Sequence, residues 1–235
     1  MDALEARYRP LVDALARPVA GASARLVAVS KTQPAEAVRA LAALGQRAFG
    51  ENYVQEALAK QRELADLDLE WHLIGPLQSN KCREAARHFD WVQSVDRAKL
   101  LPLLDKERPA DRGPLNVLLQ VNIDGEASKS GCAADEVMAL ADQAAALPHL
   151  ALRGLMAIPE PHPDEAHRRA AFARMRALFD ALRTRHPGVD TLSMGMSDDW
   201  PLAVAEGATL VRVGSALFGA RPSRDPAPVA GTEAP

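Results

Sequence analysis

The chain has 235 residues, of which 48% are hydrophobic and 25% are charged, and its formal net charge at pH 7 is −3. This length suits one large domain, and the composition is ordinary for a globular protein. The small negative charge provides no basic surface, so neither nucleic acid nor an anionic membrane is expected as a partner.

The two cysteines and the N-terminal residues together predict the cellular compartment. The two cysteines, Cys82 and Cys132, lack the spacing of a zinc site, so neither a metal site nor a disulfide framework is expected. The opening residues "MDALEARYRPLVDALA" are charged throughout and contain no apolar segment of a signal peptide. No apolar run approaches the roughly 20 residues of a membrane span. These features predict a cytoplasmic protein.

The first predicted element is a helix over residues 1–17, in which apolar side chains recur at helical spacing. Eight short runs rich in strand-forming residues follow it, separated by stretches with a helical pattern. The predicted strands cover residues 26–32, 48–52, 70–75, 91–96, 116–122, 152–158, 191–197 and 210–218. The clearest predicted helices cover residues 34–44, 54–64, 133–147 and 164–186. Pro102 is expected to kink or delay a further helix.

Eight alternations of strand and helix predict an α/β protein with a single (β/α)8 barrel of the TIM type. An open, doubly wound sheet is the rival fold, but it usually has fewer strands. No helix is predicted after the eighth strand, and the N-terminal helix is expected to cover that strand instead. Residues 220–235 are rich in Pro, Gly and Ala and predict a disordered tail. Residues 1–219 are therefore expected to form one barrel domain.

A βα barrel carries its active site at the carboxyl ends of its strands, and Lys31 ends the first one. Val27, Val29 and Lys31 share one face of a strand, so Lys31 points into the barrel mouth if the two valines fill the barrel. An amine that loses its hydration there favours its neutral form, which attacks carbonyl groups. The alternative is a lysine at a strand end whose side chain simply reaches solvent.

The last two strands contain a second unusual cation and small residues. Arg212 interrupts the apolar run "LVRVGSALFG", and a buried guanidinium needs an acceptor, which a structural ion pair would also supply. Segments 195–197 and 214–215 contain the Gly and Ser residues that let a backbone approach an anion closely, as in the phosphate sites of such barrels. An amine, a phosphate cradle and a buried cation around one mouth match pyridoxal 5′-phosphate (PLP).

Ordered motifs over residues 4–219 resemble the pyridoxal phosphate homeostasis protein family, whose barrel is similar to the N-terminal domain of alanine racemase (fold type III). These motifs are "VAVSKTQP", "FGENYVQE", "WHLIGPLQSNK", "VQSVDR", "VNIDGEASKSG", "LRGLMAIPE", "LSMGMSDDW" and "VRVGSALFG". The resemblance implies that Lys31 forms the internal aldimine and that Arg212 faces the pyridine nitrogen. It implies further cofactor contacts from Asn52, Ser193, Met194, Gly195, Met196, Ser197, Gly214 and Ser215.

The resemblance implies a protein that binds PLP, buffers the free aldehyde and supplies apo-enzymes through transient contacts. A cation beside the ring nitrogen weakens the cofactor as an electron sink, which suits binding better than carbanion chemistry. An amino-acid racemase is the main alternative, but Tyr53 is the only tyrosine near the predicted rim. A cofactor-free Schiff-base aldolase is a third class. Without a second domain to complete a shared site, a monomer is expected.

The same motifs contain residues outside the expected cofactor contacts. His72 is expected to be a hydrogen-bonded core histidine rather than a cavity residue, and Trp71 and Trp91 are expected to pack at strand starts. Lys81 and Lys129 lie in rim motifs, where anion steering and a solvated surface position both remain open.

Overall fold

The computed structural model describes residues 3–17, 23–126 and 129–219, and its strands form one closed parallel barrel in chain order. This arrangement confirms the predicted (β/α)8 barrel and excludes the open sheet. All eight predicted strands are present. Their bounds are β1 Arg25–Val29, β2 Ala48–Glu51, β3 Glu70–Leu73, β4 Trp91–Val95, β5 Leu115–Val121, β6 Leu150–Ala157, β7 Thr191–Ser193 and β8 Leu210–Val213.

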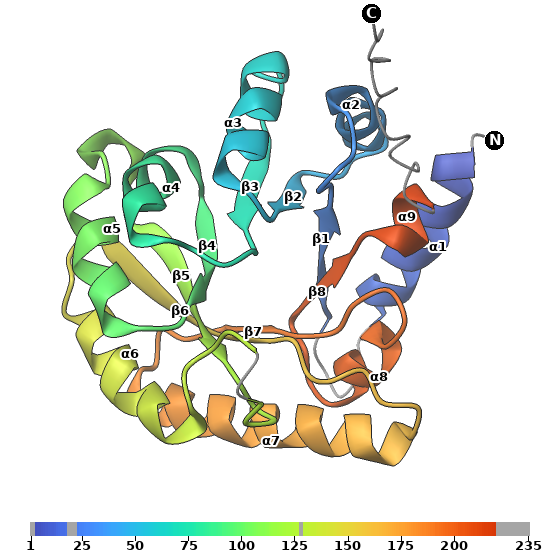
Figure 1. Ribbon diagram of the computed structural model, residues 1–235. Coiled ribbons are helices and arrows are strands. Elements are labelled where there is room, and N and C mark those ends of the chain that lie inside the picture. Colours follow the sequence, from blue (N-terminus) through green and yellow to red (C-terminus); the bar gives the residue numbers. More distant parts are fainter. Residues whose placement is uncertain (1–2, 18–22, 127–128, 220–235) are drawn as a thin grey trace, which may run out of the picture.

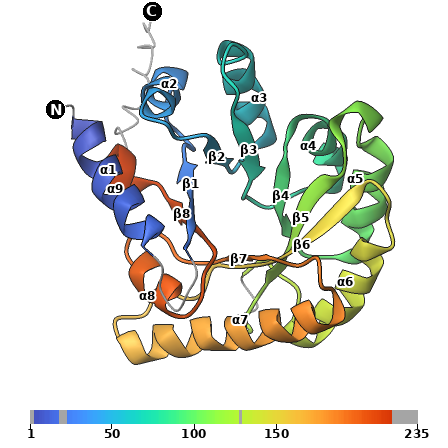
Figure 2. The same cartoon turned by 180° about the vertical axis from the view of Figure 1, so that it is seen from behind.

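The helices lie around the outside of the strands (Figure 1), and the view from behind shows the same arrangement (Figure 2). Those between consecutive strands connect parallel neighbours, as barrel topology requires. The α-helices are α1 Ala3–Ala16, α2 Ala35–Ala43, α3 Val54–Glu63, α4 Cys82–His88, α5 Leu101–Glu107, α6 Val137–Ala145, α7 Glu165–Arg185, α8 Trp200–Ala205 and α9 Ser215–Phe218. Short 3-10 turns precede α4, α5 and α6.

Strand alternation divides the apolar residues between two layers. On β8, Val211 and Val213 belong to the large core between the strands and the helices, whereas Leu210 clusters with Val27 and Ala48 inside the barrel. Residues at alternate positions of these strands therefore face the barrel interior. Because the β8 backbone continues in this alternation, Arg212 shares the inner face with Leu210.

The prediction that no helix follows the eighth strand is wrong. β8 ends at Val213, and α9 follows directly, because Gly214 leaves the extended conformation with φ −122° and ψ −77°. α1 lies beside α9 in both views (Figures 1 and 2) and also contacts β1 and α2. Arg7 Nε donates a hydrogen bond to the Leu217 carbonyl oxygen at 2.6 Å, so α1 is joined to the element that the sequence pattern missed.

Short helices are the other difference from the predicted pattern. α4 and α8 have seven and six residues, too few for a clear apolar periodicity, so the sequence pattern predicts neither of them. Pro102 lies in the first turn of α5, where a missing N–H costs no hydrogen bond, so α5 accommodates it and begins at Leu101. The predicted tail, residues 220–235, lies outside the described residues.

Two further properties concern the described ranges alone. None of their helices is long and apolar enough to cross a membrane. They also contain no cluster of three or more His, Cys, Asp or Glu side chains that could hold a metal ion.

Candidate functional site

A cavity of about 440 Å³ opens where the strands end and the βα loops begin. Its volume falls in the range of sites for small molecules and cofactors, and its position is that of the active sites of βα barrels. Seven of the ten residues predicted to contact the cofactor line it: Lys31, Asn52, Met196, Ser197, Arg212, Gly214 and Ser215. The cavity at the mouth of the barrel therefore exists as predicted, and Lys31 and Arg212 both line it.

Three predicted residues lie behind the cavity wall instead of in it. Ser193 is fully buried and contacts the Arg212 guanidinium, and Met194 belongs to the outer core. Gly195 accepts a hydrogen bond from the Arg212 backbone N–H at 3.0 Å. Gly195 has a φ of +92°, and a Cβ there would lie 2.6 Å from the Ala203 side chain, so the position requires glycine. Residues at the end of β7 thus support the cavity wall from behind without lining it.

The turn that carries Lys31 is held from both sides. On one side, Ser30 donates a hydrogen bond from its hydroxyl to Glu51 Oε1 at 2.5 Å, and its carbonyl accepts one from Lys60 Nζ at 2.7 Å. On the other side, the Thr32 N–H donates to Glu56 Oε1 at 2.6 Å. Thr32 has a φ of +64°, a conformation that costs free energy for a β-branched residue and persists only where its neighbours enforce it.

A buried ion cluster supplies those contacts. Lys60 Nζ lies 2.7 Å from Glu51 and 2.8 Å from Glu56, and both Lys60 and Glu51 are buried. Burial raises the pKa of Glu51, and the charge of Lys60 and the hydrogen bonds from Lys60 and Ser30 oppose this rise. None of these residues is among the predicted site residues. The signal that could have found them is a carboxylate inside the predicted strand 48–52, which requires a partner once it is buried.

Arg212 is a buried cation bound to neutral oxygens. It is 3% exposed, and it donates to Ser193 Oγ at 2.6 Å and to the Ala157 carbonyl at 2.8 Å. It forms no ion pair within the described part of the chain, so the predicted alternative of a structural salt bridge does not hold. Burial lowers the pKa of Arg212 to about 10, which leaves the guanidinium charged at neutral pH. Its charge is therefore available to whatever occupies the cavity.

Hydrogen-bond donors converge on Ser197 from the turn between β8 and α9. The N–H groups of Gly214 and Ala216 each lie 3.4 Å from Ser197 Oγ, and the Ser215 hydroxyl lies 3.1 Å from it. A Cβ on Gly214 would lie 3.2 Å from Val29 atoms, so glycine lets the turn after β8 pass close to the end of β1. Clustered N–H and hydroxyl donors are suited to a phosphate. Ala216 is an addition to the predicted residues.

Asn52 owes its position to a glycine in the loop after the next strand, β3. A Cβ on Gly75 would lie 2.3 Å from the Asn52 carbonyl oxygen and 2.7 Å from its Cα, far inside contact distance. Both residues line the cavity, together with Pro76. The "GP" in "LIGPLQ" thus allows two neighbouring βα loops to pack backbone against backbone.

The remaining residues of the motifs differ in whether they line the cavity. His72 is fully buried and hydrogen-bonded, and it is absent from the cavity wall, as expected for a core histidine. Trp71 and Trp91 are buried at strand starts, as expected. Of the two rim lysines, Lys129 lines the cavity and pairs with Glu126 at 2.8 Å, whereas Lys81 does not line it.

The cysteines and tyrosines lie away from the cavity wall. Burial raises the pKa of the Cys82 and Cys132 thiols to about 11, so both stay protonated and unreactive at neutral pH. Tyr53 is 65% exposed, and Tyr8 lies in the core with its hydroxyl 3.3 Å from Gln46. Among the described residues of the wall there is no tyrosine.

The closed barrel and the cavity with its lysine, arginine and donor-rich turn define a barrel of the alanine racemase type, and the family model "Alanine racemase, N-terminal domain" matches residues 1–222. A protein of Pseudomonas aeruginosa named pyridoxal phosphate homeostasis protein is 59% identical over 222 residues, 94% of each chain. The Escherichia coli protein of that name is 52% identical over 199 residues, covering 83% of this chain and 85% of its own.

The solved structures contain a similar barrel. PipY of Synechococcus elongatus, whose structure has PLP bound, superposes with a TM-score of 0.83 at 44% identity, covering 92% of this chain and 100% of its own. The chain belongs to the pyridoxal phosphate homeostasis protein family.

Proposed function

We propose that this chain binds PLP in the described cavity and acts in PLP homeostasis, buffering the cofactor and supplying it to other proteins. One observation carries the proposal: Lys31, Arg212 and the turn around Ser197 line one cavity. PLP offers an aldehyde, a ring nitrogen and a phosphate, and each of these groups has a chemically matched partner there. The bound PLP of PipY and the names of the two bacterial relatives support the same function.

In this proposal each part of the cavity has one task. Lys31 Nζ provides the covalent attachment, since a primary amine condenses with an aldehyde and releases water. Arg212 faces the ring nitrogen and keeps it unprotonated. Ser197, Ser215 and the Gly214 N–H hold the phosphate, while Asn52 and Met196 complete the wall. Ser193, Met194 and Gly195 act from behind the wall by fixing Arg212 and the end of β7.

The site suits holding the aldehyde better than turning over an amino acid. Racemization needs an acid–base group on each face of the substrate, and the described cavity wall contains no tyrosine for this task. An arginine beside the ring nitrogen also opposes the build-up of negative charge in the ring. These features favour a PLP carrier over the alternative of an amino-acid racemase.

Replacement of Lys31 tests the proposal directly. Wild-type protein incubated with PLP is expected to gain a visible absorbance band that survives desalting, and Lys31→Ala is expected to lose it. Lys81→Ala is the matched control, because Lys81 belongs to a rim motif but does not line the cavity. A Lys31→Ala protein that keeps the wild-type band would disprove the assignment of the attachment point.

A further inference from the structure

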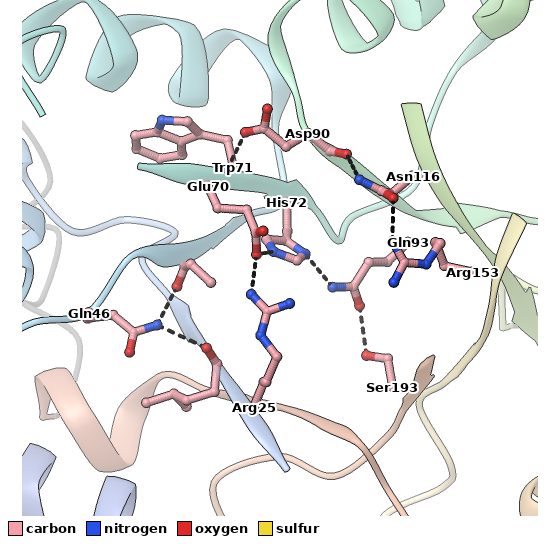
Figure 3. Close-up of polar contacts among 12 residues, drawn as sticks. Arg25, Gln46, Glu70, Trp71, His72, Asp90, Gln93, Asn116, Arg153 and Ser193 are labelled. Carbon is pink, nitrogen blue, oxygen red and sulfur yellow. Dashed lines mark hydrogen bonds and ion pairs between the residues drawn. The ribbon is translucent and has the colours of Figure 1, made fainter. Parts of the chain in front are cut away.

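A row of hydrogen bonds runs through the barrel interior and ends on Arg212. Arg212 Nη1 lies 2.6 Å from Ser193 Oγ, which lies 2.7 Å from Gln93 Oε1. Gln93 Nε2 lies 2.8 Å from His72 Nδ1, and His72 Nε2 lies 2.7 Å from Glu70 Oε1. Figure 3 shows the part from Ser193 to Glu70, where β7, β4 and β3 contribute side chains to the same interior.

The direction of every bond in this row is set by its ends. A guanidinium can only donate, so the Ser193 oxygen accepts from Arg212 and its one proton goes to Gln93 Oε1. The Gln93 amide then turns its N–H toward His72, whose Nδ1 must accept. A neutral imidazole that accepts at Nδ1 carries its proton on Nε2, and this proton points at Glu70.

The far end of the row is an ionised carboxylate. Burial raises the pKa of Glu70, but the hydrogen bond from His72 and the charge and hydrogen bond of Arg25 outweigh it and lower the pKa below its usual value. Arg25 Nη2 lies 2.8 Å from the same Oε1 atom (Figure 3). Burial lowers the pKa of His72, which favours the neutral ring. The ring also stacks on Trp91, with 5.3 Å between the centroids and 11° between the planes, so it cannot turn over easily.

We propose that His72 and Gln93 are positioning residues for Arg212, which they hold toward the cavity through Ser193. Glu70 fixes which nitrogen of His72 carries the proton, His72 fixes the orientation of the Gln93 amide, and Gln93 takes the Ser193 proton. The Ser193 oxygen is then always presented to Arg212 as an acceptor. The effect on cofactor binding rests on the proposed function, whereas the hydrogen-bond order belongs to the protein itself.

The tautomer of His72 tests the hydrogen-bond order without any cofactor. In 15N-labelled protein, long-range 1H–15N correlation spectra distinguish a protonated Nε2 from a protonated Nδ1. The chain has six histidines, and a His72→Gln variant assigns the signal. The row requires a neutral ring with the proton on Nε2 at pH 7. A neutral ring protonated on Nδ1, or a doubly protonated ring, would overturn the proposal.

A pair of glutamine variants tests the positioning effect. Gln93→Met removes the central link and is expected to weaken PLP binding about tenfold and to shift the visible band, because Arg212 loses its fixed acceptor. Gln46→Met is the matched control. Gln46 is a second buried glutamine, and its amide donates to the Leu26 and Ala48 carbonyls outside the row. The control is expected to retain wild-type affinity and band position.

The outcomes separate this inference from the proposed function. Equal affinities and bands in the two glutamine variants would overturn the positioning effect, even if both variants lose thermal stability. A wild-type protein that binds no PLP would overturn the proposed function, and the His72 tautomer would still decide the hydrogen-bond order.

Discussion

Lys31 and Arg212 are charged residues at inner positions of the barrel. The residues next to them along the strands determine these positions. β1 pairs in parallel with β8 so that Val27 lies opposite Arg212, and Val29 and Lys31 continue the same face toward the cavity. Both placements could be predicted, because alternation along a strand is visible in sequence. The partners of Arg212 could not be predicted, since Ser193 and Ala157 come from other strands and the barrel closure brings them together.

The buried cluster around Lys60 could not be derived either. Helical spacing relates Lys60 to Glu56, but the contact of Lys60 with Glu51 and with the Ser30 carbonyl depends on how α3 packs over the ends of two strands. The sequence pattern indicated only a carboxylate in an apolar strand. The site therefore depends on an ion cluster beneath the lysine turn as well as on the lysine.

Replacement of Lys60 is expected to be costly. Lys60→Met leaves the Glu51 carboxylate buried without its cation, which destabilises the fold by about 3–5 kcal/mol. Urea unfolding monitored by circular dichroism measures this loss. Lys106→Met, at an exposed position of α5, is the control and is expected to change the free energy of unfolding by less than about 0.5 kcal/mol. Equal stabilities of the two variants would show that the cluster contributes nothing.

At the scale of elements, the strands were predictable and the short helices were not. Apolar runs located all eight strands, but the eighth was extended through Phe218 because "ALF" continues the apolar run. The turn at Gly214 redirects those residues into α9, where Leu217 is buried and its carbonyl binds Arg7 of α1. Contacts between the two ends of the chain therefore determine that these residues form a helix. Such contacts cannot be recognised in a local sequence pattern.

The packing of the β2 and β3 loops gives a prediction at this scale. Gly75→Ala places a methyl group against the Asn52 backbone, so the Asn52 loop must move away from the cavity. The variant is expected to lose about 1–3 kcal/mol of stability and to retain PLP less well. Urea unfolding and dialysis against buffer measure the two effects.

Gly188→Ala is the matched control for that experiment, because a Cβ at Gly188 meets no atom within 4 Å. It is expected to match the wild type in both measurements. If Gly75→Ala also matches the wild type, the close approach of the two loops does not fix Asn52.

At the scale of the whole molecule, one chain provides every residue of the proposed site. The lysine, the arginine and the donor-rich turn come from the first and the last two strands, which closure makes neighbours. The count of eight strands made this closure predictable, since parallel strands in chain order bring the first and last together. The orientation of the side chains behind the cavity wall could not be predicted from the sequence, because it depends on contacts across the barrel interior.

A self-contained site predicts that PLP attachment does not depend on assembly. Fractional occupancy at a fixed free concentration of PLP is expected to stay constant as the protein is diluted a hundredfold, because each chain keeps its own complete cavity in any state of assembly. Size-exclusion chromatography with light scattering is expected to give the mass of one chain. Occupancy that falls on dilution together with the measured mass would indicate a site completed by a second subunit.

The central claim is that Lys31 is the covalent attachment point for PLP. Borohydride reduction of the PLP-loaded protein, followed by proteolysis and peptide mass mapping, tests it most directly. The account predicts a single stoichiometric pyridoxyl adduct on the peptide that contains Lys31, at the nitrogen of its side chain. An adduct on Lys129, on another lysine, or on none would contradict it.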